Sequence, residues 1–180
     1  VSNSDNVKNV FSKFRKDKEV YGLINVAGIA SMNLLVTTPD ETIKKIIETN
    51  LLGTIYCTKA VIPPMIRSKI GRIINFTSIA VRIGAKGEST YIASKGGVEA
   101  FSKSIARELS PANITVNTIS PAFIETQLSS GLSAKIKETV IERQIIESEC
   151  SLADVLDCVK IILSDESKKI TGEIFNIGGV

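Results

Sequence analysis

The sequence predicts an α/β fold in which a doubly wound parallel sheet carries helices on both faces. Apolar, β-branched runs at residues 20–27, 73–76 and 114–119 are typical of buried strands. A long stretch with apolar residues at helical spacing, residues 89–109, separates two of these runs. Strands that alternate with helices pair in parallel, and Ser78 follows one strand at its carboxyl end, where such sheets bind ligands.

The composition is that of a globular protein. Of the 180 residues, 43% are hydrophobic and 23% are charged, which favours a single domain over residues 1–180. The 22 basic and 19 acidic residues are scattered and leave a net charge of +3, so nucleic-acid binding is not indicated. No apolar run approaches the ~18 residues that span a membrane and the amino terminus lacks a signal pattern, so we expect a soluble, cytoplasmic protein.

Metal sites and histidine-based catalysis are disfavoured by the residue content. The chain has no histidine, and Cys57, Cys150 and Cys158 are too dispersed to form a zinc ligand set. We therefore expect no bound metal, whereas a site built from tyrosine and lysine remains open.

The amino-terminal part predicts a helix, a strand and a second helix. Apolar side chains recur at helical spacing at Val7, Val10, Phe11 and Phe14. This spacing predicts an amphipathic helix over residues 4–18, ahead of the strand at residues 20–27. Pro39 and Asp40 open the next helix, and Pro63 with Pro64 should interfere with its continuation over residues 51–65.

The remaining elements follow in order. Residues 79–89 form a loop whose glycines suit a pocket wall, and the helix at residues 89–109 carries an apolar stripe for the core or a subunit interface. The stripe consists of Val98, Phe101, Ile105 and Leu109. Residues 127–150 are the least regular stretch, residues 152–163 form an amphipathic helix, and residues 170–177 lead into the last strand.

Tyr91 and Lys95 are the most informative pair of residues. They lie four residues apart on a predicted helix and therefore project from one face. An adjacent ammonium favours phenolate, so Lys95 should lower the pKa of Tyr91 from its usual value of about 10 toward the range for proton exchange. A single Tyr-x-x-x-Lys is usually helix-surface chemistry and a lone Ser78 is usually a turn or a cap, so the interpretation depends on what accompanies them.

Two further motifs accompany these residues. Asn50 lies in Asn50-Leu51-Leu52-Gly53, inside a helix that asparagine does not favour, and Asn25-Val26-Ala27-Gly28 ends a predicted strand. With Ser78, Tyr91 and Lys95 at matching spacing, they resemble the classical short-chain dehydrogenase/reductase family from Val1 to Val180. The resemblance implies a Rossmann-like doubly wound sheet.

Within this family the chain is most similar to the 3-oxoacyl-(acyl-carrier-protein) reductase type. The similar motifs are Ile46-Ile47-Glu48-Thr49-Asn50-Leu51, Ala106-Arg107-Glu108, Ile114-Thr115-Val116-Asn117, Phe123-Ile124-Glu125-Thr126 and Ile170-Thr171-Gly172-Glu173. They recur in reductases of other substrates, so they identify the branch better than the substrate.

The resemblance implies an NAD(P)H-dependent oxidoreductase that reduces a ketone to a secondary alcohol. Tyr91 would protonate the carbonyl oxygen, Ser78 would hold it, and Lys95 would lower the phenol pKa and bind the ribose. Asn50 would distort its helix and hold a water that relays protons to Lys95, or, in the structural alternative, bond to the helix backbone. The residues implied to contact the cofactor are Asn25, Val26, Gly28, Tyr91, Lys95, Ile124 and Thr126. NADP is preferred, with NAD as the alternative.

The chain departs from the family pattern in several places. Ala122 replaces a glycine of a turn and would be strained if that turn needs a positive φ. Val26 replaces a second asparagine. Residues 145–148 replace the Pro-Leu-Gly-Arg turn of the family's mobile substrate lid, which falls at residues 127–150. The glycine-rich turn for the pyrophosphate is absent. By family likeness roughly 60 residues would precede Val1. The chain would then be the carboxyl-terminal two-thirds to three-quarters of the family domain, with a bare sheet edge at residues 20–27.

Substrate and partners stay open. The resemblance implies a small-molecule or carrier-linked ketone, and the basic carrier-docking positions of the resembled reductases fall at Lys69 and Ala112. A dehydrogenase of a sugar, a steroid or a small alcohol is the alternative, and a non-enzymatic scaffold with an incomplete cofactor site is a third reading. A homodimer or homotetramer is implied, because the family commonly pairs the helix at residues 89–109 across subunits.

Overall fold

The structure, a computed structural model, describes residues 1–14, 20–131 and 133–180. These residues form a sheet of parallel strands in the order β1-β2-β3-β4. The strands are β1 (Gly22–Asn25), β2 (Gly71–Phe76), β3 (Ile114–Ser120) and β4 (Ile174–Asn176). In this register Ile24 pairs with Ile74 and Asn75 pairs with Thr118. The predicted α/β fold with a parallel sheet is therefore confirmed.

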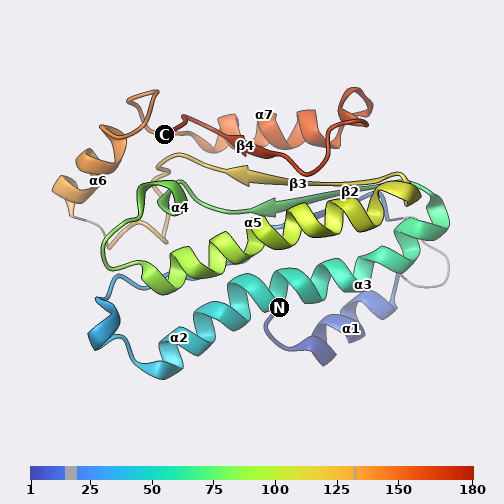
Figure 1. The fold of residues 1–180 in the computed structure, drawn as a ribbon, viewed down its shortest axis with the longest axis horizontal. Coiled ribbons are helices and arrows are strands. Elements are labelled where there is room, and N and C mark those ends of the chain that lie inside the picture. The colour runs from blue at the N-terminus through green and yellow to red at the C-terminus, as the bar shows by residue number, and fades with distance from the viewer. Residues whose placement is uncertain (15–19, 132) are drawn as a thin grey trace.

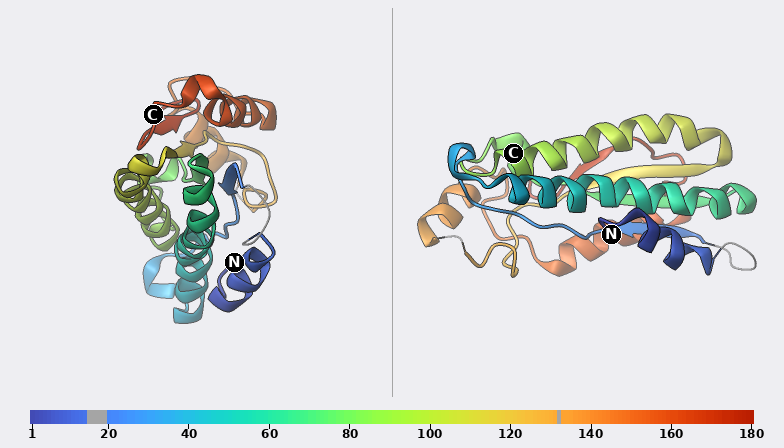
Figure 2. Two further views of the ribbon diagram at one scale, coloured as in Figure 1. Left: turned by 90° about the vertical axis from the view of Figure 1, so that its right-hand side faces the viewer. Right: turned by 90° about the horizontal axis from the view of Figure 1, so that it is seen from below.

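Helices cover both faces of the sheet (Figure 1). One face carries α1 (Ser4–Ser12), α2 (Asp40–Ile47), α3 (Gly53–Ser68) and α5 (Ser89–Leu109), and the other carries α7 (Leu152–Leu163). Figure 2 shows α1 packed beside α3, on the side away from α5. The short helices α4 (Ala80–Ile83) and α6 (Ala134–Ile141) lie at the end toward which the arrows of β2 and β3 point. Single turns occur at η1 (Leu35–Thr37), η3 (Ser110–Ala112) and η4 (Asp165–Ser167).

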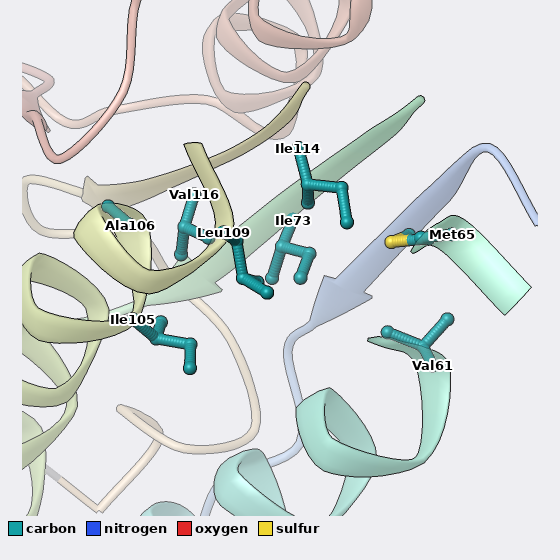
Figure 3. Packing of buried hydrophobic residues seen from close by; sticks show 8 residues of the cluster. All are labelled: Val61, Met65, Ile73, Ile105, Ala106, Leu109, Ile114 and Val116. Atoms are coloured by element: carbon teal, nitrogen blue, oxygen red, sulfur yellow. The ribbon is translucent and has the colours of Figure 1, made fainter. Parts of the chain in front are cut away.

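Successive residues of β2 face opposite helical layers. Ile73 belongs to a buried cluster between the sheet, α3 and α5, whereas Ile74 packs against residues of α7. Figure 3 shows the first cluster, which consists of Val61, Met65, Ile73, Ile105, Ala106, Leu109, Ile114 and Val116. Because Val98, Ile105 and Leu109 are already buried within one chain, the predicted apolar stripe of α5 contributes to the core.

Amide side chains tie the sheet to its neighbours. Asn25 Nδ2 donates to Asn75 Oδ1 at 2.8 Å, and Asn75 Nδ2 donates to Ser102 Oγ on α5 at 2.8 Å. On β3, Asn117 Nδ2 donates to Ile170 O at 2.9 Å and Asn117 Oδ1 accepts from Glu173 N at 3.2 Å. These paired groups avoid the penalty of buried polar atoms without partners.

Helix α3 corrects the prediction for the double proline. It continues through Pro63 and Pro64 and ends at Ser68, where a break near the prolines was expected. A proline removes the donor to the carbonyl four residues earlier, which here belongs to Lys59 and Ala60. Neither residue is buried, so water can satisfy both carbonyl groups and the helix tolerates the loss.

Other element boundaries differ more modestly. The loop predicted at residues 79–89 contains α4, and the irregular stretch 127–150 contains α6. The helix expected over residues 4–18 is present as α1 to Ser12, whereas residues 15–18 lie outside the described residues. β1 is an edge strand of the described sheet, as expected, and the side chain of Ile24 is exposed there.

Candidate active site

A cavity of about 710 Å³ lies at the carboxyl ends of β1, β2 and β3. Its walls come from the segments that follow these strands, from α4, from the first turns of α5 and from α6. Much of the lining is apolar and includes Ile79, Ile83, Phe123, Ile136 and Val140. The position agrees with the crevice in which open parallel sheets bind ligands.

Ser78, Tyr91 and Lys95 all line this cavity. Ser78 lies just beyond β2, and Tyr91 and Lys95 project from the start of α5, one helical turn apart. Tyr91 and Lys95 are both buried although their side chains end in polar groups. The structure therefore brings the three predicted catalytic residues to one place from two elements.

Tyr91 is held in its protonated form. Burial raises the pKa of the phenol, a hydrogen bond with Ser78 lowers it, and the nearby Glu88 raises it, so that the net change is upward. This differs from the lowered pKa that the sequence predicts. Lys95 Nζ lies 5.9 Å from the centroid of the Tyr91 ring and donates to Phe76 O, so burial dominates over the ammonium. A protonated phenol is the state required of a proton donor.

Lys95 carries its charge in a nearly closed environment. The residue is 5% exposed, and burial lowers its pKa from 10.5 to about 8. Nζ donates to Phe76 O at 2.9 Å, which leaves two of the three ammonium hydrogens for other partners. At neutral pH the side chain remains mostly charged.

Asn50 lies in η2 (Glu48–Leu52), a π-helical segment between α2 and α3. Such segments frequently mark functional sites, and the predicted distortion of this helix is present. The fully buried side chain donates to Ile29 O at 2.9 Å and to Ser94 Oγ at 3.0 Å, and it accepts from Ile29 N at 2.8 Å. The Asn50 side chain thus joins the segment after β1 to α5 and makes none of these bonds to the backbone of its own helix. Its part in a proton relay stays a prediction.

Gly28 lies against both Lys95 and Asn50. A Cβ at this position would be 3.3 Å from Lys95 Nζ and 3.4 Å from Asn50 Oδ1. Glycine therefore keeps space open beside the ammonium, where a side chain would crowd it.

The residues predicted to contact a cofactor divide into two groups. Val26, Gly28, Ile124 and Thr126 line the cavity with Tyr91 and Lys95. Asn25 does not line it, because its amide donates to Asn75 Oδ1 at 2.8 Å and to Thr58 Oγ1 at 3.2 Å. Its amide hydrogens serve the fold, so the geometry gives no support for their contact with a cofactor.

Ala122 is accommodated without backbone strain. Among the described non-glycine residues only Lys69 and Asn113 have positive φ, so the left-handed conformation considered for Ala122 does not occur. Gly178 provides the room for its methyl group, since a Cβ at Gly178 would approach Ala122 Cβ to 2.6 Å. The loss of the family glycine at position 122 is therefore compatible with this turn.

Gln144 supports a residue of the cavity wall, and the sequence analysis did not predict this role. The residue is 3% exposed, and its Oε1 accepts from Phe123 N at 2.7 Å. Its Nε2 donates to Ile146 O at 3.1 Å and to Ser148 O at 2.7 Å. It therefore fastens the chain that follows α6 to the wall that follows β3. The sequence holds little signal for this role, because Phe123 lies 21 positions away from Gln144.

Comparison with known proteins identifies the family. Residues 1–179 match the family described as enoyl-(acyl-carrier-protein) reductase. The chain belongs to the short-chain dehydrogenase/reductase family. It is an NAD(P)H-dependent oxidoreductase of that family.

Several family members with curated descriptions are similar to this chain. The 3-oxoacyl-[acyl-carrier-protein] reductase FabG of Staphylococcus epidermidis is 36% identical over 173 residues, which cover 96% of this chain and 70% of that protein. FabG of Escherichia coli K12 is 36% identical over 180 residues, covering 99% and 74% respectively. FabG of Staphylococcus aureus is 35% identical over 157 residues, covering 87% and 64%.

The residues that the structure describes contain neither a cluster of metal ligands nor a membrane-spanning helix. No group of three or more His, Cys, Asp or Glu side chains in them could hold a metal ion. No helix in the same ranges is both long enough and apolar enough to cross a membrane.

Proposed function

We propose that this chain reduces the ketone of a 3-oxoacyl group linked to acyl carrier protein, with NADPH as the hydride donor. The observation that carries the proposal is the convergence of Ser78, Tyr91 and Lys95 on one largely apolar cavity. The substrate class is taken from the relatives, which are named 3-oxoacyl-[acyl-carrier-protein] reductases. An apolar wall suits the alkyl part of an acyl chain.

The residues around Lys95 suit a nicotinamide dinucleotide. Lys95 would donate ammonium hydrogens, and Tyr91 its hydroxyl, to the ribose of the cofactor. Gly28 keeps the space beside Lys95 free, because a Cβ at this position would lie against the ammonium. Val26, Ile124 and Thr126 would hold the cofactor from the facing walls. When bound, the cofactor supplies a hydride to the ketone carbon.

Tyr91 supplies the proton in this proposal. Burial keeps the phenol protonated at neutral pH, and its hydrogen bond with Ser78 places two hydroxyl groups side by side. A ketone oxygen between these hydroxyls accepts a hydrogen bond from each and takes the Tyr91 proton as negative charge develops on it. Ser78 keeps its proton and stabilises the developing charge.

Lys95 and Asn50 support the proton transfer. The Lys95 ammonium, 5.9 Å from the Tyr91 ring centroid, favours the phenolate that remains after the proton has left. Asn50 Oδ1 and Lys95 Nζ both lie against Gly28, so a water held there would return a proton to Tyr91 through Lys95.

An apolar ketone of another class, such as a steroid, is the second candidate. The apolar lining disfavours a sugar, whose hydroxyl groups would be left without partners. Lys69 and Ala112 precede β2 and β3, at the end of the sheet opposite to the cavity. The two positions at which the resembled reductases dock their carrier therefore do not border the cavity of the same chain.

The substrate class is tested by comparing three acceptors. Consumption of NADPH is measured with acetoacetyl-acyl carrier protein, with the coenzyme A thioester of acetoacetate and with a simple methyl ketone, and each assay is repeated with NADH. We expect kcat/KM for the carrier-linked ketone to exceed that for the methyl ketone by at least about tenfold, because remote binding energy supports the reacting centre. Equal values would reject the carrier-linked substrate, and no turnover of any ketone would reject the reductase.

A further inference from the structure

Glu99 makes an ion pair and a hydrogen bond with residues next to the catalytic serine. It lies on α5, one helical turn after Lys95. Its Oε1 accepts from Thr77 Oγ1 at 2.8 Å and from Arg82 Nη1 at 3.1 Å, and its Oε2 accepts from the same Nη1 at 2.9 Å. One carboxylate therefore binds two residues that belong to the segment after β2.

These two partners flank Ser78. Thr77 immediately precedes the serine and Arg82 follows it by one turn of α4, whose first amide, Ala80 N, donates to Ser78 Oγ at 3.2 Å. Thr77 Oγ1 also lies 3.4 Å from Lys95 O, and Thr77 N donates to Ile119 O at 2.9 Å. Both ends of the Ser78 turn are thus attached to α5, the helix that carries Tyr91 and Lys95.

The attachment is stronger than a typical surface ion pair. The Glu99 side chain is 13% exposed and that of Arg82 is 31% exposed, so water screens the pair only in part. The carboxylate also receives the Thr77 hydroxyl, and charge-assisted hydrogen bonds of this kind are stronger than neutral ones. Removing Arg82 alone would leave Glu99 with one hydroxyl partner in a half-closed site.

We propose that Glu99 is a positioning residue which, through Thr77 and Arg82, holds Ser78 in register with Tyr91 for ketone reduction. The inference rests on the proposed function, because it assigns Ser78 and Tyr91 to the same carbonyl oxygen. Glu99 does not line the cavity, so it acts only through the residues that it holds. Small misplacements of reacting groups reduce the rate strongly, whereas the binding of the cofactor depends on other contacts.

The first test is Glu99→Gln, which keeps the size of the side chain and an acceptor for Thr77 but removes the charge. We expect kcat to fall roughly tenfold or more while KM for NADPH changes less than about threefold. Glu108→Gln is the matched control, since it makes the same chemical change at an exposed position of α5 and should leave kcat unchanged.

Charge reversal separates positioning from general loss of structure. Arg82→Glu alone places two carboxylates together and should lower kcat at least as much as Glu99→Gln. The double variant Arg82→Glu with Glu99→Arg restores an ion pair in the opposite sense and should recover part of that loss. Thr77→Val, which removes only the hydroxyl, gives an independent variant if Glu99→Gln does not fold.

A titration of Tyr91 tests the same inference without turnover. The chain has three tyrosines, so Tyr91 is assigned in a spectrum of carbon-13-labelled tyrosine by its loss in Tyr91→Phe. Because the hydrogen bond with Ser78 lowers the pKa of Tyr91, releasing Ser78 in Glu99→Gln should raise that pKa, and the double reversal should lower it again.

The outcomes keep the two proposals apart. If the wild-type protein is active and both Glu99→Gln and Thr77→Val leave kcat and the Tyr91 titration unchanged, the positioning role of Glu99 is overturned. An inactive wild-type protein would reject the proposed function and with it the link to ketone reduction. The Tyr91 titration would then still decide whether Glu99 holds Ser78 against Tyr91, since a shift supports this contact and no shift rejects it.

Discussion

At the scale of single residues, the burial of Lys95 sets the stability of the fold against the role proposed for this side chain. Its pKa is lowered to about 8 by burial, against 10.5 in the unfolded chain. Each tenfold change in proton affinity corresponds to about 1.4 kcal/mol, so the charged side chain opposes folding by roughly 3 kcal/mol at neutral pH. The role proposed for Lys95 requires the charged side chain at neutral pH, and the fold tolerates the unfavourable contribution to its stability.

Lys95→Met should therefore stabilise the protein while abolishing turnover. The substitution removes the buried charge but leaves Phe76 O without its donor, so we expect a net gain of about 2 kcal/mol in the free energy of unfolding at about pH 7. Urea unfolding measures the difference, and Lys103→Met, at an exposed position of α5, is the control. A variant less stable than the wild type at neutral pH would contradict the buried-charge argument.

The pH dependence of that difference has a definite sign. Below about pH 8 the lysine is protonated in both the folded and the unfolded chain, so the advantage of Lys95→Met is fully present. Between about pH 8 and pH 10.5 the folded lysine is neutral while the unfolded chain still binds a proton, so the wild type gains stability as the pH rises. The two proteins should converge toward the upper end of this range.

At the scale of elements, polar side chains join the segments around the cavity. Asn50 connects the segment after β1 to α5, Glu99 connects the segment after β2 to α5, and Gln144 connects the segment after β3 to the chain following α6. Each amide or carboxylate spans elements that have no strand pairing with each other. The cavity walls therefore depend on a few side chains.

Gln144→Ala should loosen the cavity wall that follows β3. It leaves Phe123 N, Ile146 O and Ser148 O without their partners, and we expect KM for the ketone to rise roughly tenfold with a smaller change in kcat. Gln144→Glu keeps the acceptor for Phe123 N and should have an intermediate effect. Gln127→Ala, at the exposed position of the other glutamine, is the matched control. An unchanged KM in Gln144→Ala would mean that the wall does not depend on this side chain.

The elements also show what local sequence patterns can predict. The spacing of Tyr91 and Lys95 and the place of Ser78 after a β-branched run, together with the motifs at Asn25 and Asn50, predicted that these side chains lie close together, because helix geometry and strand ends are local properties. The continuation of α3 through Pro63 was not predicted, because it depends on which side of the helix faces water. Gln144 was not predicted, because its role is a contact across 21 positions.

At the scale of the whole molecule, the sheet provides a common edge for chemistry from distant parts of the sequence. Parallel strands bring residues after β1, β2 and β3 to one end, and the alternation of Ile73 and Ile74 secures a helical layer on each face. The parallel pairing of the strands and the family were predicted from sequence pattern. The direction of the Tyr91 pKa shift was predicted wrongly, because burial of the ring depends on the complete packing around it.

In the proposed reaction Tyr91 donates the proton to the reduced ketone. The most direct measurement is kcat for Tyr91→Phe with acetoacetyl-acyl carrier protein and NADPH, together with the affinity of this variant for NADPH. We expect kcat to fall by about 10²-fold or more, because a positioned acid contributes typically 10²–10⁴-fold, while cofactor affinity stays within about threefold. If Tyr91→Phe turns over at the wild-type rate, Tyr91 is not the proton donor.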